Sequence, residues 1–245
     1  MTEQEPQTVH VGGSVDKALA RAISLNIGAM LKEAWQGAAR LDRGILSPLL
    51  MLVGLSLVLG SIMLEVMGML GWTITDIQGQ SLLQLVLTVM LAPAYAGIQL
   101  IALQHVVGLR PPLNMLWHWY RIGPVLSLAA LLTMAISSLG TALFIIPGLL
   151  LQVVLAPVLM LVADKGMSPF AAIRVSVIVG FKYFAAFLVC QLLLIVAVAV
   201  GVLTFGLAAL WLAPFYLRFQ AIIYRELFGV RLKLATGQQQ ALFNA

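Results

Sequence analysis

Charged residues are scarce in this chain. Only 9% of its 245 residues are Asp, Glu, Lys or Arg, whereas 62% are hydrophobic. A soluble domain of this length has too small a core to hide that much apolar surface, so lipid must cover it. About 20 apolar residues cross the hydrocarbon as a helix. The composition therefore predicts an all-α, polytopic membrane protein.

Residues that carry metal-binding or catalytic chemistry are also few. Cys190 is the single cysteine, which excludes an intrachain disulfide and a cysteine metal site. His10, His105 and His118 have no second ligand at helical spacing. The chain has no paired carboxylates, no phosphate-binding glycine loop and no nucleophile elbow. We therefore expect no metal, no cofactor, no catalytic residue and no enzymatic activity.

Six apolar stretches are long enough to cross a membrane, and we predict that they form three helical hairpins. They cover approximately residues 45–70, 81–107, 124–143, 147–163, 181–203 and 206–224. All 14 Lys and Arg residues fall on one side of this layout. The positive-inside rule makes that side cytoplasmic and places both termini there. The net charge of +5 is then a topology signal, and we expect no binding to nucleic acid.

An amphipathic helix is predicted before each odd-numbered span. The three segments are residues 27–42, 112–123 and 168–180. Apolar residues occupy one helical face of the first segment and polar residues the other. Trp35, Trp117 and Trp119 stand beside basic residues, a composition typical of the lipid headgroup region. We expect these helices to lie in the cytoplasmic interface.

The tripeptide Leu-Ala-Pro occurs three times, at residues 91–93, 155–157 and 212–214. It predicts an internal repeat with units of about 27–107, 108–165 and 166–229, arranged around a pseudo-threefold axis. In units one and three, eight of twenty positions are identical at a constant offset of 121 residues, including Tyr95 with Tyr216 and Gln99 with Gln220. Chance matches in a sequence rich in Leu and Ala are the alternative. Residues 1–26 are expected to be a disordered cytoplasmic segment, and residues 230–245 a cytoplasmic tail.

Proline and polar residues inside the spans are the candidate functional positions. Each proline removes a backbone donor and should kink its helix, which could shape a central cavity or serve packing alone. Glutamines could line a polar interior or join helices. An arginine in a span is a functional candidate, or it snorkels to the headgroups. The candidates are Pro93, Pro157, Pro214, Gln99, Gln220 and Arg218.

Three consecutive stretches carry a resemblance to a known family. They are residues 146–149, 155–160 and 162–174, with the sequences IPGL, LAPVLM and VADKGMSPFAAIR. In these stretches the chain resembles the YciC family of uncharacterised bacterial inner-membrane proteins. More loosely, it is similar to the membrane region of some glycerophosphodiester phosphodiesterases. The resemblance implies a polytopic protein of the cytoplasmic membrane and supplies no catalytic residue.

These observations favour a non-enzymatic inner-membrane protein with a lipid- or envelope-associated accessory role. Its expected partners are membrane lipids and an unidentified membrane protein. The alternative is a transporter or channel for a small molecule or lipid, with a pathway along spans two, four and six. A transporter should gather polar residues around a midplane cavity, whereas an accessory protein should show a packed bundle with a groove for lipid or partner.

Overall fold

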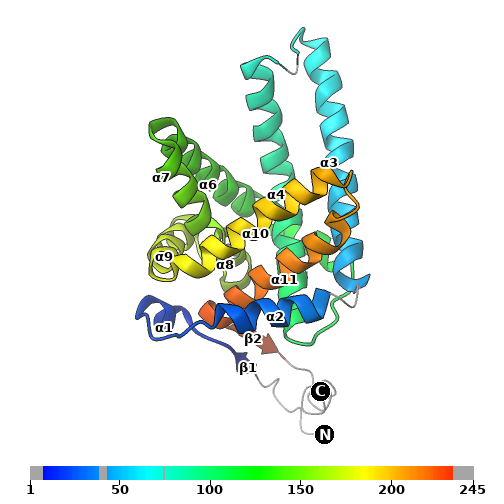
Figure 1. Ribbon diagram of the computed structural model, residues 1–245. Helices are drawn as coiled ribbons and strands as arrows, with labels where there is room; N and C mark the ends of the chain where they lie inside the picture. The colour runs from blue at the N-terminus through cyan, green and yellow to red at the C-terminus, as the bar shows by residue number, and fades with distance from the viewer. Residues whose placement is uncertain (1–7, 39–42, 74, 234–245) are drawn as a thin grey trace, which may run out of the picture.

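The computed structural model describes residues 8–38, 43–73 and 75–233 (Figure 1). In chain order the elements are β1 (Thr8–Val11), α1 (Val15–Leu19), α2 (Ile27–Ala38), α3 (Arg43–Met69), α4 (Ile77–Val106), α5 (Met115–His118), η1 (Trp119–Ile122), α6 (Gly123–Leu143), α7 (Ile145–Leu155), α8 (Val158–Lys165), α9 (Pro169–Lys182), α10 (Phe184–Leu203), α11 (Ala209–Phe228) and β2 (Val230–Lys233). The helical class predicted from the sequence is confirmed.

Five segments of the described chain are long and apolar enough to cross a membrane: Gly44–Met69, Ile77–Val106, Met115–Leu143, Gly148–Lys165 and Phe184–Leu203. They correspond to the first five predicted spans. The sixth predicted span falls on α11, which is less apolar because it contains Arg218, Arg225 and Glu226. The protein is therefore a multi-pass helical membrane protein, and the six-span arrangement stays a prediction.

Helices that are adjacent in sequence pack as pairs. The pairs are α3 with α4, α6 with α7, and α10 with α11. In Figure 1 the α3–α4 pair projects beyond the other helices, whereas α10 and α11 run obliquely across the lower part of the molecule. α4 also contacts α6, α8 and α11, so it lies at the centre of the helical packing. Its second half, from Ala92 to Leu103, is accordingly buried almost without interruption.

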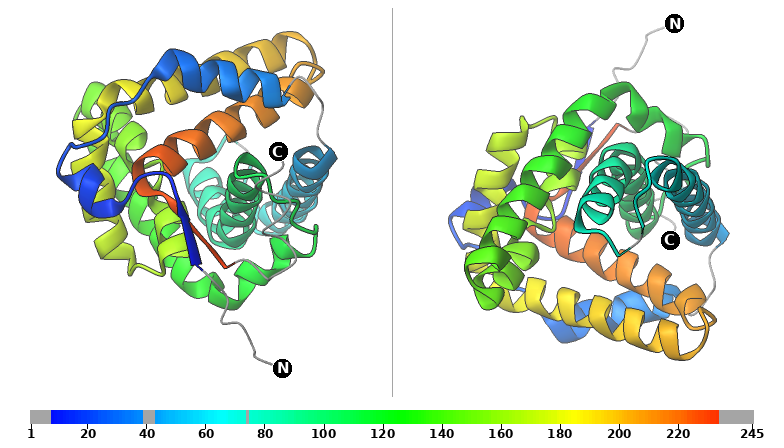
Figure 2. Two further views of the ribbon diagram at one scale, coloured as in Figure 1. Left: turned by 90° about the horizontal axis from the view of Figure 1, so that it is seen from below. Right: turned by 90° about the horizontal axis from the view of Figure 1, so that it is seen from above.

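Each predicted amphipathic segment contains a helix, and each of these helices packs on the last helix of a different pair; residues 39–42 of the first segment lie outside the described residues. α5 and η1 pack on α4, α9 packs on α7, and α2 packs on α11. Figure 2 shows α2 along one side of the molecule and the segment of α5 and η1 across the opposite side. Helix α2 turns Met30, Ala34 and Ala38 inward, as its sequence periodicity predicts.

Small residues permit each of these contacts. A side chain at Gly180 of α9 would meet Val154 of α7 at 2.6 Å, and one at Gly97 of α4 would meet Trp119 of η1 at 3.0 Å. On the third side, a side chain at Gly37 of α2 would meet the guanidinium of Arg218 on α11 at 2.5 Å. Close approach of the backbones at small residues is a common way for membrane helices to associate.

The prediction of a disordered segment does not describe residues 8–26. Strand β1 pairs antiparallel with β2, with Thr8 opposite Lys233 and Val11 opposite Val230. The amide of Gly13 donates to the carbonyl of Arg225 over 3.1 Å. Gly12 has a positive φ of 92°, and a Cβ there would meet the Arg225 carbonyl oxygen at 2.1 Å. The polar composition of this segment suggested disorder. The sequence does not reveal that β1 has a partner, because β2 lies more than 200 residues away.

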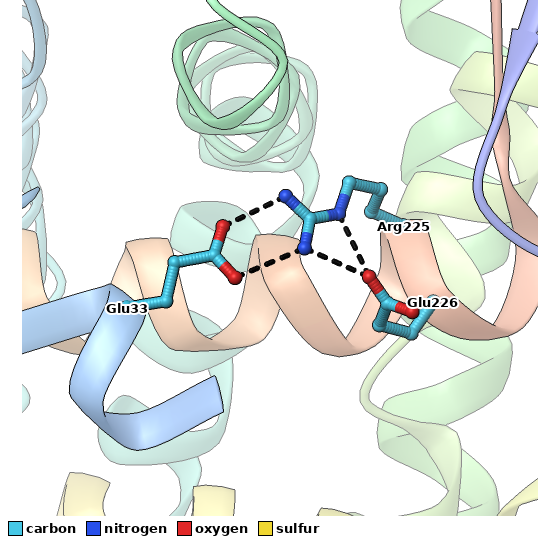
Figure 3. A network of polar contacts seen from close by, with 3 residues as sticks. All are labelled: Glu33, Arg225 and Glu226. Atoms are coloured by element: carbon cyan, nitrogen blue, oxygen red, sulfur yellow. Dashed lines mark hydrogen bonds and ion pairs between the residues drawn. The ribbon is translucent and has the colours of Figure 1, made fainter. Parts of the chain in front are cut away.

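An ion-pair network fastens α2 to the end of α11 (Figure 3). The Arg225 guanidinium donates to both Glu33 carboxylate oxygens over 2.8 and 3.0 Å. It also donates to Glu226 Oε1. Burial alone would lower the pKa of Arg225, but the hydrogen bonds and charges of Glu33 and Glu226 outweigh burial and raise the pKa. The bidentate geometry fixes the register of α2 on α11.

Candidate functional site

A polar cavity lies between α4, α6, α8, α10 and α11. Its volume is about 390 Å³. Hydroxyl and amide side chains contribute much of its lining, and none of the described residues that line it is charged. The polar lining residues are Gln84, Thr88, Tyr95, Thr133, Ser137, Ser138, Gln152, Gln191, Tyr216 and Gln220. Uncharged hydrogen-bonding groups are therefore concentrated at one place inside an otherwise apolar membrane domain.

The three Leu-Ala-Pro motifs all contribute to this cavity. Tyr95, Leu159 and Tyr216 each lie two residues after the proline of a motif, and all three line the cavity. Pro93, Pro157 and Pro214 are themselves buried. The proline-bearing segments α4, α7–α8 and α11 thus converge on one site, with a tyrosine from two of them and a leucine from the third.

Two tyrosines and two glutamines form a cluster at the site. Tyr95, Tyr216 and Gln220 line the cavity, and Gln99 lies beside Tyr95 without lining it. The Tyr216 side chain also lies beside the buried thiol of Cys190 on α10. Gln99 and Gln220 are only 2% and 7% exposed. The sequence alignment at an offset of 121 residues pairs these same tyrosines and glutamines.

Three polar atoms of this cluster lack a hydrogen-bond partner among the described residues. They are both side-chain amide atoms of Gln99 and the Oε1 atom of Gln220. An unsatisfied buried polar group costs about 1–3 kcal/mol, and most native proteins avoid it. The three atoms are buried behind the cavity surface, so the groups that a bound molecule contacts directly belong to the lining residues Tyr95, Tyr216 and Gln220.

A second, apolar hollow adjoins the polar cavity. Its volume is about 600 Å³, and it shares Gln84, Thr88, Tyr95 and Leu159 with the polar cavity. The rest of its lining is mostly leucine: Leu52 on α3, and Leu83, Leu87 and Leu91 on α4. The combined space is amphipathic, with hydroxyl and amide groups at one end and aliphatic side chains at the other.

Hydroxyl groups on neighbouring helices satisfy backbone carbonyls at two of the prolines. Pro93 cannot donate to the Val89 carbonyl four residues earlier. The Ser127 hydroxyl of α6 donates to that carbonyl instead, over 2.7 Å. The Tyr120 hydroxyl donates to the next carbonyl, that of Met90, over 3.1 Å. These bonds hold the turn of α4 before Pro93 against η1 and α6.

Pro157 has a similar environment. It stands at the break between α7 and α8. The Ser176 hydroxyl of α9, which is fully buried, donates to the Val154 carbonyl at this break over 2.6 Å. A serine hydroxyl therefore holds α7 against α9 at Pro157, as another holds α4 against α6 at Pro93. Each proline shapes the wall of the cavity and also fixes a helix contact.

The structure brings together only part of the predicted set of site residues. Gln99 and Gln220 meet in one cluster, whereas Arg218 is not among the residues that line either hollow and runs against Gly37 of α2. Sequence reasoning did not select Tyr95 and Tyr216 as site residues. Their equivalent positions in units one and three were the signal that could have identified them.

No protein family, curated protein or solved structure matches this chain. The resemblance to the YciC family therefore stays a proposal, and the functional argument rests on the geometry of the site.

Proposed function

We propose that this membrane protein binds an uncharged lipid whose head carries hydroxyl groups. The observation that supports the proposal is a cavity lined by many hydroxyl and amide groups and by no charged residue among those described, with Tyr95, Tyr216 and Gln220 of the Tyr–Gln cluster in the lining. Hydroxyl groups both donate and accept hydrogen bonds, so they can pair with the tyrosine hydroxyls as well as with the amide groups of the lining.

The absence of charge in the lining sets the class of ligand. A charged head that entered the cavity would lose its hydration without gaining an opposite charge, which costs several kcal/mol. A neutral head loses much less and regains hydrogen bonds from the cluster. The adjoining leucine-lined hollow supplies an apolar surface along which an acyl or prenyl chain can lie.

The wider role follows the expectation from the sequence. We place the protein in a YciC-like group of the bacterial inner membrane, with six spans in three repeated hairpins and both termini in the cytoplasm. Its role is lipid- or envelope-associated and accessory rather than enzymatic. The contacts of α5–η1, α9 and α2 with α4, α7 and α11 support the repeat, because each amphipathic helix packs on the preceding hairpin in cyclic order.

A transporter of a small neutral molecule is the second candidate. It is favoured by the position of the cavity between α4, α8 and α11, which are the segments that bear the prolines. Transport requires access from both sides of the membrane, whereas lipid binding requires access only from the bilayer. Flux of a neutral solute into proteoliposomes would support the transporter and count against the accessory role.

A stability measurement tests the lipid proposal. Gln220→Leu removes an amide with an unsatisfied oxygen from the cavity lining, so the ligand-free variant should unfold at an equal or higher temperature than wild type. Dioctanoylglycerol should raise the unfolding temperature of wild type and should protect the variant much less. Gln78→Leu, at an exposed position near the start of α4, is the matched control and should respond like wild type.

Dioctanoyl phosphatidic acid has the same chains and a charged head, so it tests the class of ligand. We expect little protection from this lipid through the Tyr–Gln cluster, and therefore an equal response in wild type and Gln220→Leu. Equal protection of wild type and Gln220→Leu by dioctanoylglycerol would contradict the proposal.

A further inference from the structure

A third hollow lies at the start of α10. Its volume is about 450 Å³, and it lies between the loop after α1 and the junction of α9 with α10. Arg21 and Lys182 line it, together with Tyr183, Phe181 and Phe184. It shares no residue with the cavities described above and plays no part in the proposed binding of a neutral lipid.

Two hydrogen bonds hold the walls of this hollow together. The Lys182 ammonium group donates to the Leu19 carbonyl. The Ile23 amide donates to the Tyr183 hydroxyl over 3.2 Å. Residues 19–23 are thereby fastened to α9 and α10 on both sides of Arg21. These two bonds fix the position of the loop after α1 against α9 and α10.

The positive charge of the hollow is not neutralised. No carboxylate lines it, and the described residues provide no ion pair for Arg21 or Lys182. Other cations on the protein differ, because Lys165 pairs with Asp164 and Arg225 pairs with Glu33 and Glu226. Two unpaired cations that face one hollow attract an anion.

The hydrogen-bond donors left over also suit an anion with several oxygens. Lys182 uses one of its three N–H groups on Leu19. The Tyr183 hydroxyl accepts a bond from Ile23, and its own proton remains free to donate. The guanidinium of Arg21 offers a planar pair of donors that matches two phosphate oxygens.

Apolar neighbours place this hollow at a membrane interface. Phe181 is 55% exposed, and α10, which starts at Phe184, is one of the helices apolar enough to span. Figure 1 shows α1 beneath α9, on the side of the molecule that carries β1 and β2. A phosphate seated between Arg21 and Lys182 would leave its acyl chains beside Phe181 and the first turn of α10. We infer that this hollow binds the phosphodiester head of an anionic phospholipid.

Arg21 offers a test that leaves the fold intact. Its φ is 55°, in the left-handed region that glycine adopts without strain. Arg21→Gly should therefore fold at least as stably as wild type while it removes the guanidinium. Lys182→Gln keeps a donor for the Leu19 carbonyl and removes the charge. Arg174→Gln is the matched control, because Arg174 is an exposed cation on the same helix that does not line the hollow.

The experiment is a titration of the purified full chain in a neutral detergent with dioctanoyl phosphatidylglycerol. We expect Arg21→Gly and Lys182→Gln to bind about tenfold more weakly each, the effect of one charge-assisted hydrogen bond. Arg174→Gln should bind like wild type. Dioctanoylglycerol should bind equally to wild type, Arg21→Gly and Lys182→Gln, because its proposed site is the polar cavity, which shares no residue with this hollow. Inorganic phosphate should bind far more weakly than the phospholipid, because it lacks the acyl chains.

Two results would overturn the inference. Unchanged phospholipid binding in Arg21→Gly and Lys182→Gln, or an equal loss in Arg174→Gln, would remove the site. Inorganic phosphate that binds as tightly as the phospholipid would assign the hollow to free phosphate and exclude the lipid.

Discussion

Replacement of Ser127 tests how a proline-containing helix is stabilised in this membrane domain. The Val89 carbonyl lacks its usual amide partner because Pro93 follows four residues later. Ser127→Ala removes the hydroxyl that donates to this carbonyl over 2.7 Å. The carbonyl is then left without a donor in apolar surroundings, whereas the smaller alanine side chain adds no clash.

The expected loss in the free energy of unfolding follows from three quantities. A neutral hydrogen bond contributes about 0.5–1.5 kcal/mol, and an unsatisfied buried acceptor adds about 1–3 kcal/mol. Bonds between membrane helices contribute less, about 0.6 kcal/mol on average and about 1.7 at most, because the unfolded chain in the membrane finds other partners. For a carbonyl that cannot bond within its own helix we expect the upper end, about 1.5 kcal/mol, or roughly tenfold in the unfolding equilibrium.

Reversible unfolding in mixed micelles with increasing SDS measures this change, and a double-mutant cycle with Pro93→Ala isolates its cause. The Pro93→Ala substitution would restore an amide donor for the Val89 carbonyl, so Ser127→Ala should then lose less than about 0.5 kcal/mol. Ser61→Ala is the control, because the Ser61 hydroxyl bonds to its own helix at an exposed position. An equal loss in the presence and absence of Pro93 would show that the Ser127 hydroxyl does not compensate for the missing proline amide.

Three further predictions concern packing, the amino-terminal segment and topology. Gly180→Ala should lower the free energy of unfolding by about 1–3 kcal/mol, since its Cβ would press on the backbone of α7 at 2.8 Å, while Gly60→Ala in open space should not; equal effects in the same SDS titration would argue against the α7–α9 contact. Gly12→Ala should raise hydrogen exchange in β1 and β2, because a Cβ would meet a carbonyl of α11, and unchanged protection would disprove this docking. Thr75→Cys and Gln240→Cys should label from opposite sides of the membrane; labelling of both from one side would exclude the six-span layout.

Local patterns in the sequence predicted much of the fold. Apolar length located the long helices, and the 3.6-residue periodicity of residues 27–38 gave the buried face of α2. The segment 168–180 was predicted to be helical, and α9 begins there at Pro169, where the Ser168 hydroxyl accepts the Ala171 amide over 3.4 Å. These features depend on neighbours within one or two turns, which the sequence displays directly.

Features that depend on distant partners were missed. The pairing of β1 with β2 joins the two ends of the described chain, and no local pattern marks it. The break of the fourth span into α7 and α8 at Pro157 was expected only as a kink; Ser176, supplied by α9, satisfies a carbonyl at that break. Tyr95 and Tyr216 carried a signal in their shared repeat position, but only packing shows that they meet.

Mass spectrometry of the lipid that stays bound to the purified protein after mild extraction distinguishes a neutral ligand from a charged one. Wild type should retain an uncharged, hydroxyl-bearing lipid in stoichiometric amount. A variant with Tyr95→Phe and Tyr216→Phe loses two hydroxyl groups from the lining of the cavity and should lose most of that lipid. Absence of a neutral lipid from wild type, or equal retention by the double variant, would rule out the proposed lipid site.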